Sequence, residues 1–141
     1  DRRSELNHLL IPEIEKGNIQ NLELLLDKAS EKLKYSIETH VVGGVLKEKW
    51  PRKDIDLLCT IQNVQNRLIY GTPLNKAEIS FKILEEITKE ALVNNNSFMI
   101  TQITGPYMDH EYENPEILAH NGSIVVKPLE GTKIEIINNF S

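Results

Sequence analysis

Cysteine is almost absent from this sequence, since Cys59 is the only one among 141 residues. A single cysteine cannot form a disulfide within the chain, and disulfides persist mainly in oxidising compartments. We therefore expect a reduced, cytoplasmic setting. Cys59 falls on the apolar face of a predicted strand, which favours a core residue over a nucleophile.

Long hydrophobic runs are also absent. No apolar stretch approaches the roughly 20 residues that a membrane-spanning helix needs, and the amino terminus lacks the pattern of a secretion signal. We therefore expect no membrane partner. Because the chain begins with Asp1 rather than Met, we expect a processed chain or a piece of a longer protein.

Positive charge is in deficit. Lysine and arginine number 16 against 21 acidic residues, which gives a net charge of −5 and a pI near 5.4. A whole-surface duplex-binding mode needs a basic face, so we expect no binding to duplex DNA. A small local basic patch is still compatible with this charge. A Ser-His-Asp arrangement and a Walker-type phosphate loop are missing as well.

What is present suits one globular domain over residues 1–141, because 40% of the residues are hydrophobic and 26% are charged. Periodicity predicts two helices, two strands, a helix and three strands. The fold class is therefore α+β, or mixed α/β, with a mixed sheet flanked by helices in the order α-α-β-β-α-β-β-β. The predicted helices cover residues 4–16, 19–34 and 73–93, and the predicted strands cover 36–42, 54–61, 98–103, 124–127 and 133–137.

Glycine and proline indicate where these elements end. Gly17-Asn18 predicts a stop of the first helix and a cap of the second, although Pro12 is an alternative break. Thr72-Pro73 is typical of a helix start. Residues 105–121 are expected to be irregular, and residues 128–132 to form the turn of a hairpin.

Asp54 and Asp56 are the first candidates for chemistry. They stand two residues apart on a predicted strand, so their side chains share one face about 7 Å apart along it. Mg²⁺ prefers oxygen ligands and usually binds through one or two carboxylates together with substrate phosphates. Gly43-Gly44 ends the preceding strand, and glycine lets a backbone approach phosphate closely. A triphosphate between the glycines and the aspartates is therefore our hypothesis.

The pattern of Gly43-Gly44, nine residues and then Asp54-Ile55-Asp56-Leu57 resembles the signature of the polymerase-beta-type nucleotidyltransferase superfamily. Val-Val-Gly-Gly and Pro-Arg-Lys-Asp-Ile-Asp-Leu-Leu are similar in particular to its small stand-alone domains. The likeness is firm over residues 36–61 and topological over 72–137. It implies a nucleotidyltransferase-like sheet, two Mg²⁺ ions and an NTP substrate such as ATP.

The resemblance also implies a third carboxylate on a later strand. Glu135 is our candidate, because Ile134 and Ile136 suit the core face and leave Glu135 on the other. A charged side chain within an apolar strand is costly unless it is paired, and a bound metal ion would compensate its charge. Its role would be a metal ligand or a general base. Glu130 is the alternative, although its place in a turn favours solvation.

Basic residues next to the aspartates are candidates for phosphate contact. Arg52 and Lys53 directly precede Asp54, and arginine suits bidentate contacts while lysine acts as a point charge. Lys47, Lys49 and Lys127 are nearby alternatives. His40 is interpreted as structural or partly exposed, and residues 109–113 as a polar loop rather than a second metal site.

The leading hypothesis is a metal-dependent nucleotidyltransferase that moves a nucleoside monophosphate from an NTP to an acceptor and releases pyrophosphate. The acceptor is a small molecule, a protein or an RNA end, and the oligomeric state is open. The alternative is a weakly active or inactive nucleotide-binding module, antitoxin-like, on the same fold, since 141 residues leave little room for an acceptor site. A structural domain with an accidental Asp-x-Asp is the third reading.

Overall fold

A five-stranded mixed sheet forms the centre of the molecule in the computed structural model, which describes residues 6–47, 50–65, 67–108 and 118–140. The strand order is β1-β2-β9-β8-β5. Strands β2 and β9 run parallel, and the other neighbours are antiparallel. The strand bounds are β1 (Ile37–Val42), β2 (Asp54–Ile61), β5 (Phe98–Thr104), β8 (Ser123–Pro128) and β9 (Lys133–Phe140).

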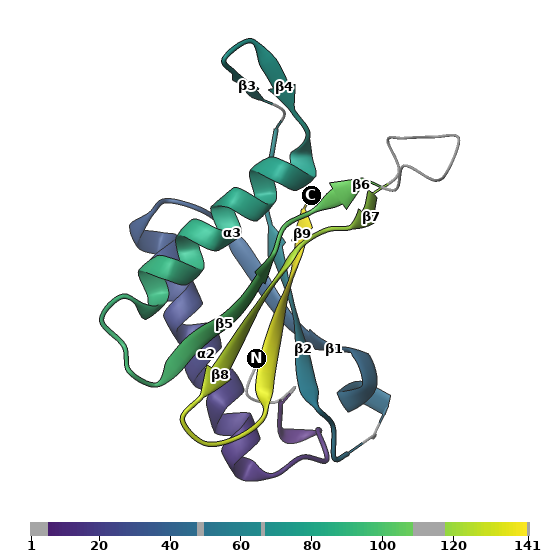
Figure 1. Cartoon of the computed structure of the whole chain (residues 1–141). Coiled ribbons are helices and arrows are strands. Elements are labelled where there is room, and N and C mark those ends of the chain that lie inside the picture. The colour runs from purple at the N-terminus through teal and green to yellow at the C-terminus, as the bar shows by residue number, and fades with distance from the viewer. Residues whose placement is uncertain (1–5, 48–49, 66, 109–117, 141) are drawn as a thin grey trace.

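Two helices, α2 (Glu13–Lys32) and α3 (Lys76–Leu92), pack side by side against this sheet (Figure 1). Alternate residues of β2 and β9 are buried, as expected when one face of a sheet meets a core and the other does not. The core contains fully buried side chains from both helices and from the central strands: Leu22, Leu26, Leu84, Ile87, Ile55, Leu57, Ile134 and Ile136. The acidic candidates lie on the opposite face.

The predicted α+β class and order of helices and sheet strands are confirmed. The chain is helical at Leu6 and Asn7, breaks before Pro12 and enters α2 at Glu13. The predicted stop at Gly17-Asn18 is wrong, and the break lies at the alternative, Pro12. Helix α2 continues through Gly17 because buried apolar side chains follow from Ile19 onward and the buried Glu15 before it is hydrogen-bonded to Thr132. These contacts outweigh the roughly 1 kcal/mol cost of one glycine.

Replacing Gly17 with alanine is therefore expected to stabilise the protein. Gly17 is exposed inside a helix, and a Cβ built there meets nothing within 4 Å. Alanine loses less backbone entropy on folding than glycine does, so the free energy of unfolding should rise by about 0.5–1 kcal/mol. Urea unfolding of the two proteins measures the difference, and a variant less stable than the wild type would contradict it.

The predicted helix start at Thr72-Pro73 is also wrong. Residues Thr72–Leu74 form β4, which pairs with β3 (Arg67–Ile69) in a hairpin that projects from the sheet (Figure 1). Tyr70 and Gly71 both have positive φ, as a two-residue type I′ turn requires. Asn75 caps α3 instead, because its side chain accepts a hydrogen bond from the Glu78 N–H at 2.9 Å.

Part of the segment expected to be irregular forms a second small hairpin. Strand β6 (Tyr107–Met108) pairs with β7 (Leu118–His120), and residues 109–113, interpreted above as a polar loop, lie outside the described residues. The expected hairpin between β8 and β9 is confirmed by their antiparallel pairing. Among the described helices, none combines the length and the apolar character needed to cross a membrane.

Helix α2 holds the turn that leads into β9. The carboxylate of Glu15 is almost fully buried and accepts hydrogen bonds from the backbone N–H and the hydroxyl of Thr132, both at 3.0 Å. Asn18 donates its side-chain N–H to the carbonyl of Glu130 at 2.8 Å. These contacts fix the start of the strand that carries Glu135.

Candidate metal centre and adjoining pocket

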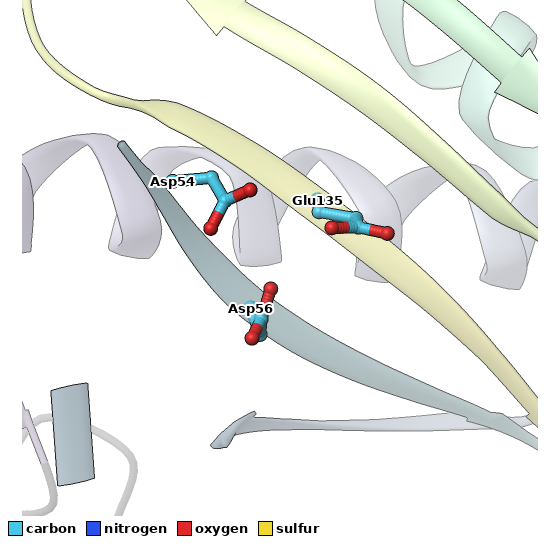
Figure 2. Close-up of side chains that lie close together, drawn as sticks. All are labelled: Asp54, Asp56 and Glu135. Atoms are coloured by element: carbon cyan, nitrogen blue, oxygen red, sulfur yellow. The ribbon is translucent and has the colours of Figure 1, made fainter. Parts of the chain in front are cut away.

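The sheet brings three carboxylates together on its open face. Asp54 and Asp56 project from the same side of β2, and Glu135 projects beside them from β9 (Figure 2). Because β2 and β9 are paired in parallel, Asp56 lies directly opposite Glu135, and Asp54 lies opposite Lys133. The three predicted residues are thus neighbours across two strands that lie far apart in the sequence.

The donor set fits a hard divalent cation. One oxygen from each of the three side chains lies within 4.8 Å of the others, and all three residues are partly buried. Oxygen ligands of Mg²⁺ lie about 2.1 Å from the ion, so two on opposite sides are roughly 4.2 Å apart. Small side-chain rotations would therefore bring the three oxygens to ligand distances. Carboxylate oxygens are also the ligand type that Mg²⁺ selects.

The carboxylate of Asp56 lies in an electrostatically unfavourable place. Burial raises the pKa of its carboxyl above the ordinary value, and the negative charges of Asp54 and Glu135 raise that pKa further. The Arg52 guanidinium acts in the opposite direction. A cation between the carboxylates would remove the repulsion, which is the electrostatic reason for expecting one here.

Gly43 lies directly against Asp56. It begins the short 3₁₀ helix η1 (Gly43–Lys47) with φ of +81°, and a Cβ built there would lie 2.6 Å from Oδ2 of Asp56. Both facts require glycine, because L side chains rarely adopt this φ and the carboxylate occupies the space. The glycine turn and Asp56 are therefore packed directly against each other.

Gly44 lies against Arg52 in the same way. A Cβ built at Gly44 would lie 1.9 Å from the guanidinium nitrogen Nη1 of Arg52. Arg52 is partly buried, whereas Lys53 is exposed. The absence of a side chain at Gly44 thus leaves room for the Arg52 guanidinium near Asp56. Phosphate contact by Arg52 and by the glycine backbone stays a prediction.

A pocket of about 380 Å³ adjoins the acids on the side away from the glycines. This volume lies within the range of small-molecule sites, about 300–1,000 Å³. Strands β2, β9, β8 and β5 form its floor, and the β6–β7 hairpin forms a wall. Its lining residues are Asp54, Gln102, Thr104, Tyr107, His120, Ser123, Val125, Lys133 and Glu135.

Most of these lining residues were missed from the sequence. Lys133 could have been predicted, because it stands two residues before Glu135 on the same strand and therefore on the same face. Tyr107 and His120 carried no periodic signal, since they come from two-residue and three-residue strands. Their rings stack with centroids 5.4 Å apart and planes 3° from parallel.

Among the described residues, the remaining candidates are not members of the carboxylate group. Glu130 is exposed in the β8–β9 turn and is not a member of the carboxylate group. Cys59 is fully buried, as expected for a core residue, and His40 is exposed. Lys127 is exposed on β8, while Lys49 and the side chain of Lys47 lie outside the described part of the chain.

Comparisons with family models, with curated proteins and with solved structures found no match to this chain. The resemblance to polymerase-beta-type nucleotidyltransferases therefore depends on the glycine pair, the Asp-x-Asp motif and the arrangement of the strands that carry them.

Proposed function

We propose that this chain is a metal-dependent nucleotidyltransferase that moves a nucleoside monophosphate from an NTP to a hydroxyl acceptor. The observation that carries the proposal is the convergence of Asp54, Asp56 and Glu135 on one sheet face, with their oxygens within 4.8 Å. The position of Gly43 against Asp56 supports it, because it places the glycine turn beside the carboxylates.

Asp54, Asp56 and Glu135 would hold Mg²⁺, and the chemistry calls for two such ions. When bound, the metal neutralises charge that develops on the attacking and leaving oxygens of an in-line displacement. The backbone of Gly43 and Gly44 together with Arg52 would hold the phosphates on one side of the acids. The pocket on the other side would then receive the acceptor.

The transfer step is a substitution at the α-phosphorus of the NTP. The acceptor oxygen bonds to the α-phosphorus, the bond from that phosphorus to the oxygen bridging to the β-phosphate breaks, and pyrophosphate leaves with the electron pair. The hydroxyl proton passes to a carboxylate. Glu135 is our candidate for it, because Glu135 belongs to the acidic group and also lines the pocket.

The test compares Glu135→Gln with Glu130→Gln, two substitutions of the same kind on the same hairpin. Pyrophosphate release from NTPs in the presence of Mg²⁺ is expected to fall about a hundredfold for Glu135→Gln, since the group that accepts the hydroxyl proton is lost. Glu130→Gln should match the wild type, because Glu130 is exposed and its hydrogen bond to Asn18 comes from the backbone.

Equal rates for the two variants would exclude Glu135 from the reaction. Mg²⁺-dependent NTP binding without pyrophosphate release, tested with a panel of hydroxyl acceptors, would favour the regulatory, antitoxin-like module instead. Absence of both heat and thermal shift on titration with Mg²⁺ and ATP would point to a structural domain, since a ligand that binds the folded form stabilises it.

A further inference from the structure

We propose that the pocket beside Glu135 takes a small uncharged ligand with a flat ring and a hydroxyl group, of the nucleoside class, and that this ligand is the acceptor. Its role as acceptor depends on the nucleotidyltransferase activity proposed above. Its binding in the pocket does not, because binding depends only on the residues that line the pocket.

The pocket has two chemically different ends. Asp54, Glu135 and Lys133 lie at one end, next to the candidate metal centre. The described residues that line the other end include no carboxylate, lysine or arginine: Gln102, Thr104, Tyr107, His120, Ser123 and Val125. A ligand charged at its far end would find no counter-charge there, which favours an uncharged molecule.

Register sets the distance between these ends. Glu135 pairs with Val125 on β8, and Val125 pairs with Gln102 on β5. Neighbouring strands are about 4.8 Å apart, so Glu135 and Gln102 are separated by roughly 10 Å across the sheet. A nucleoside placed along this row would present a ribose hydroxyl to Glu135 while its base reached Gln102.

The aromatic wall selects for a flat ring. Tyr107 stacks on His120 and is still 53% exposed, so its aromatic surface is only partly covered by the histidine. Any of the nucleobases can stack on such a side chain, because every base has a π face. The ring pair therefore offers a binding surface that a simple hydroxylated chain would not use.

The wall is also held in place before any ligand arrives. His120 Nδ1 accepts a hydrogen bond from the Gly122 N–H at 2.9 Å, which orients the imidazole. The adjoining turn is fixed by Asn138, which is fully buried and donates its side-chain N–H to the Asn121 carbonyl at 2.7 Å. Ser80 of α3 in turn donates to Asn138 at 2.6 Å. A preorganised wall lowers the ordering cost of binding.

Neutral hydrogen-bonding groups complete the selection. Gln102 offers both an amide donor and an acceptor, while Thr104 and Ser123 offer hydroxyls. Gln102 donates to Thr104 at 3.3 Å, a long bond that a ligand can replace. Amide and hydroxyl groups match the edge of a base, which carries donors and acceptors side by side.

The experiment is isothermal titration calorimetry of the metal-free protein with adenosine, guanosine, cytidine and uridine. Glucose serves as a hydroxylated probe without a flat ring. At least one nucleoside is expected to bind, and glucose is not. Tyr107→Ala should weaken that binding about tenfold or more, because one stacking surface is lost. Tyr70→Ala is the matched control, since Tyr70 is a fully exposed tyrosine on the β3–β4 hairpin.

Gln102→Leu is a second variant that keeps the side-chain size, and it should weaken nucleoside binding several-fold or change the preferred base. Absence of binding by every nucleoside, or binding unchanged in both variants, overturns the proposal, as does glucose binding alone. Tyr107-dependent binding with no pyrophosphate release from any NTP retains the nucleoside pocket and removes the transferase. Release onto a nucleoside acceptor whose KM rises in Tyr107→Ala with kcat retained supports both proposals.

Discussion

Asp56→Asn is expected to abolish Mg²⁺-dependent NTP turnover while making the metal-free protein more stable. Asp56 shares a strand face with Asp54 and is paired with Glu135 on β9, so its loss removes one of the three ligands. Metal-based charge stabilisation is worth several kcal/mol in the transition state. Turnover should therefore fall about a thousandfold or more, since each 1.36 kcal/mol is a factor of ten.

The gain in stability follows from the raised pKa of Asp56, which burial and the two neighbouring acids cause. The folded protein holds this proton more tightly than the unfolded chain, whose carboxyl titrates near 3.8. Without metal, the contribution of Asp56 to stability is therefore largest at low pH and is lost as pH rises from 3.8 through the raised folded pKa. Asparagine is neutral throughout, so the variant avoids that loss.

Thermal unfolding in EDTA at several pH values measures this effect. The difference in stability between Asp56→Asn and the wild type should grow as pH rises through this window and then level off. Added Mg²⁺ should stabilise the wild type and leave the variant almost unchanged. An active Asp56→Asn protein, or one less stable than the wild type in EDTA at neutral pH, would count against the candidate metal centre.

Gly43→Ala is expected to damage both stability and activity, and Gly71→Ala provides its control. The two glycines have almost the same φ, +81° and +80°. Alanine in this left-handed region costs roughly 1–2 kcal/mol at either position. A Cβ at Gly71 meets nothing within 4 Å, whereas a Cβ at Gly43 would lie 2.6 Å from the carboxylate of Asp56.

The extra effect at Gly43 therefore reports the contact with Asp56. Overpacking of this kind adds about 1–3 kcal/mol to the destabilisation, and displacing Asp56 by about 1 Å should cost about a hundredfold in turnover. Urea unfolding and pyrophosphate release, measured on both variants, separate the two contributions. Equal losses of stability and full activity in both variants would show that the glycine turn is not coupled to the acids.

The acidic group was predictable because strand alternation is a local property. Ile134 and Ile136 had to face the core, and this placed Glu135 on the face that Asp54 and Asp56 share. The parallel pairing of β2 with β9 makes these faces adjacent. No local pattern in either strand predicts that pairing. A third acid was expected from the resemblance to a known superfamily rather than from the residue pattern.

The errors arose where tertiary contacts override local signals. Gly17 is typical of a helix stop, yet α2 continues through it because Glu15 before it and apolar side chains after it are buried. Thr72-Pro73 is typical of a helix start, yet these residues pair with β3, and Asn75 supplies the cap. The pocket wall was missed because Tyr107 and His120 meet only through a hairpin and a buried network around Asn138.

The position of β9 has a consequence for the protein's synthesis. This strand follows every other strand of the sheet in the sequence, yet it lies in the middle, between β2 and β8. A ribosome therefore releases β2 and β8 before the strand that joins them, and each keeps an unpaired edge until β9 emerges. Glu135 belongs to β9, so the acidic group of the nascent chain is not assembled until β9 has been inserted between β2 and β8.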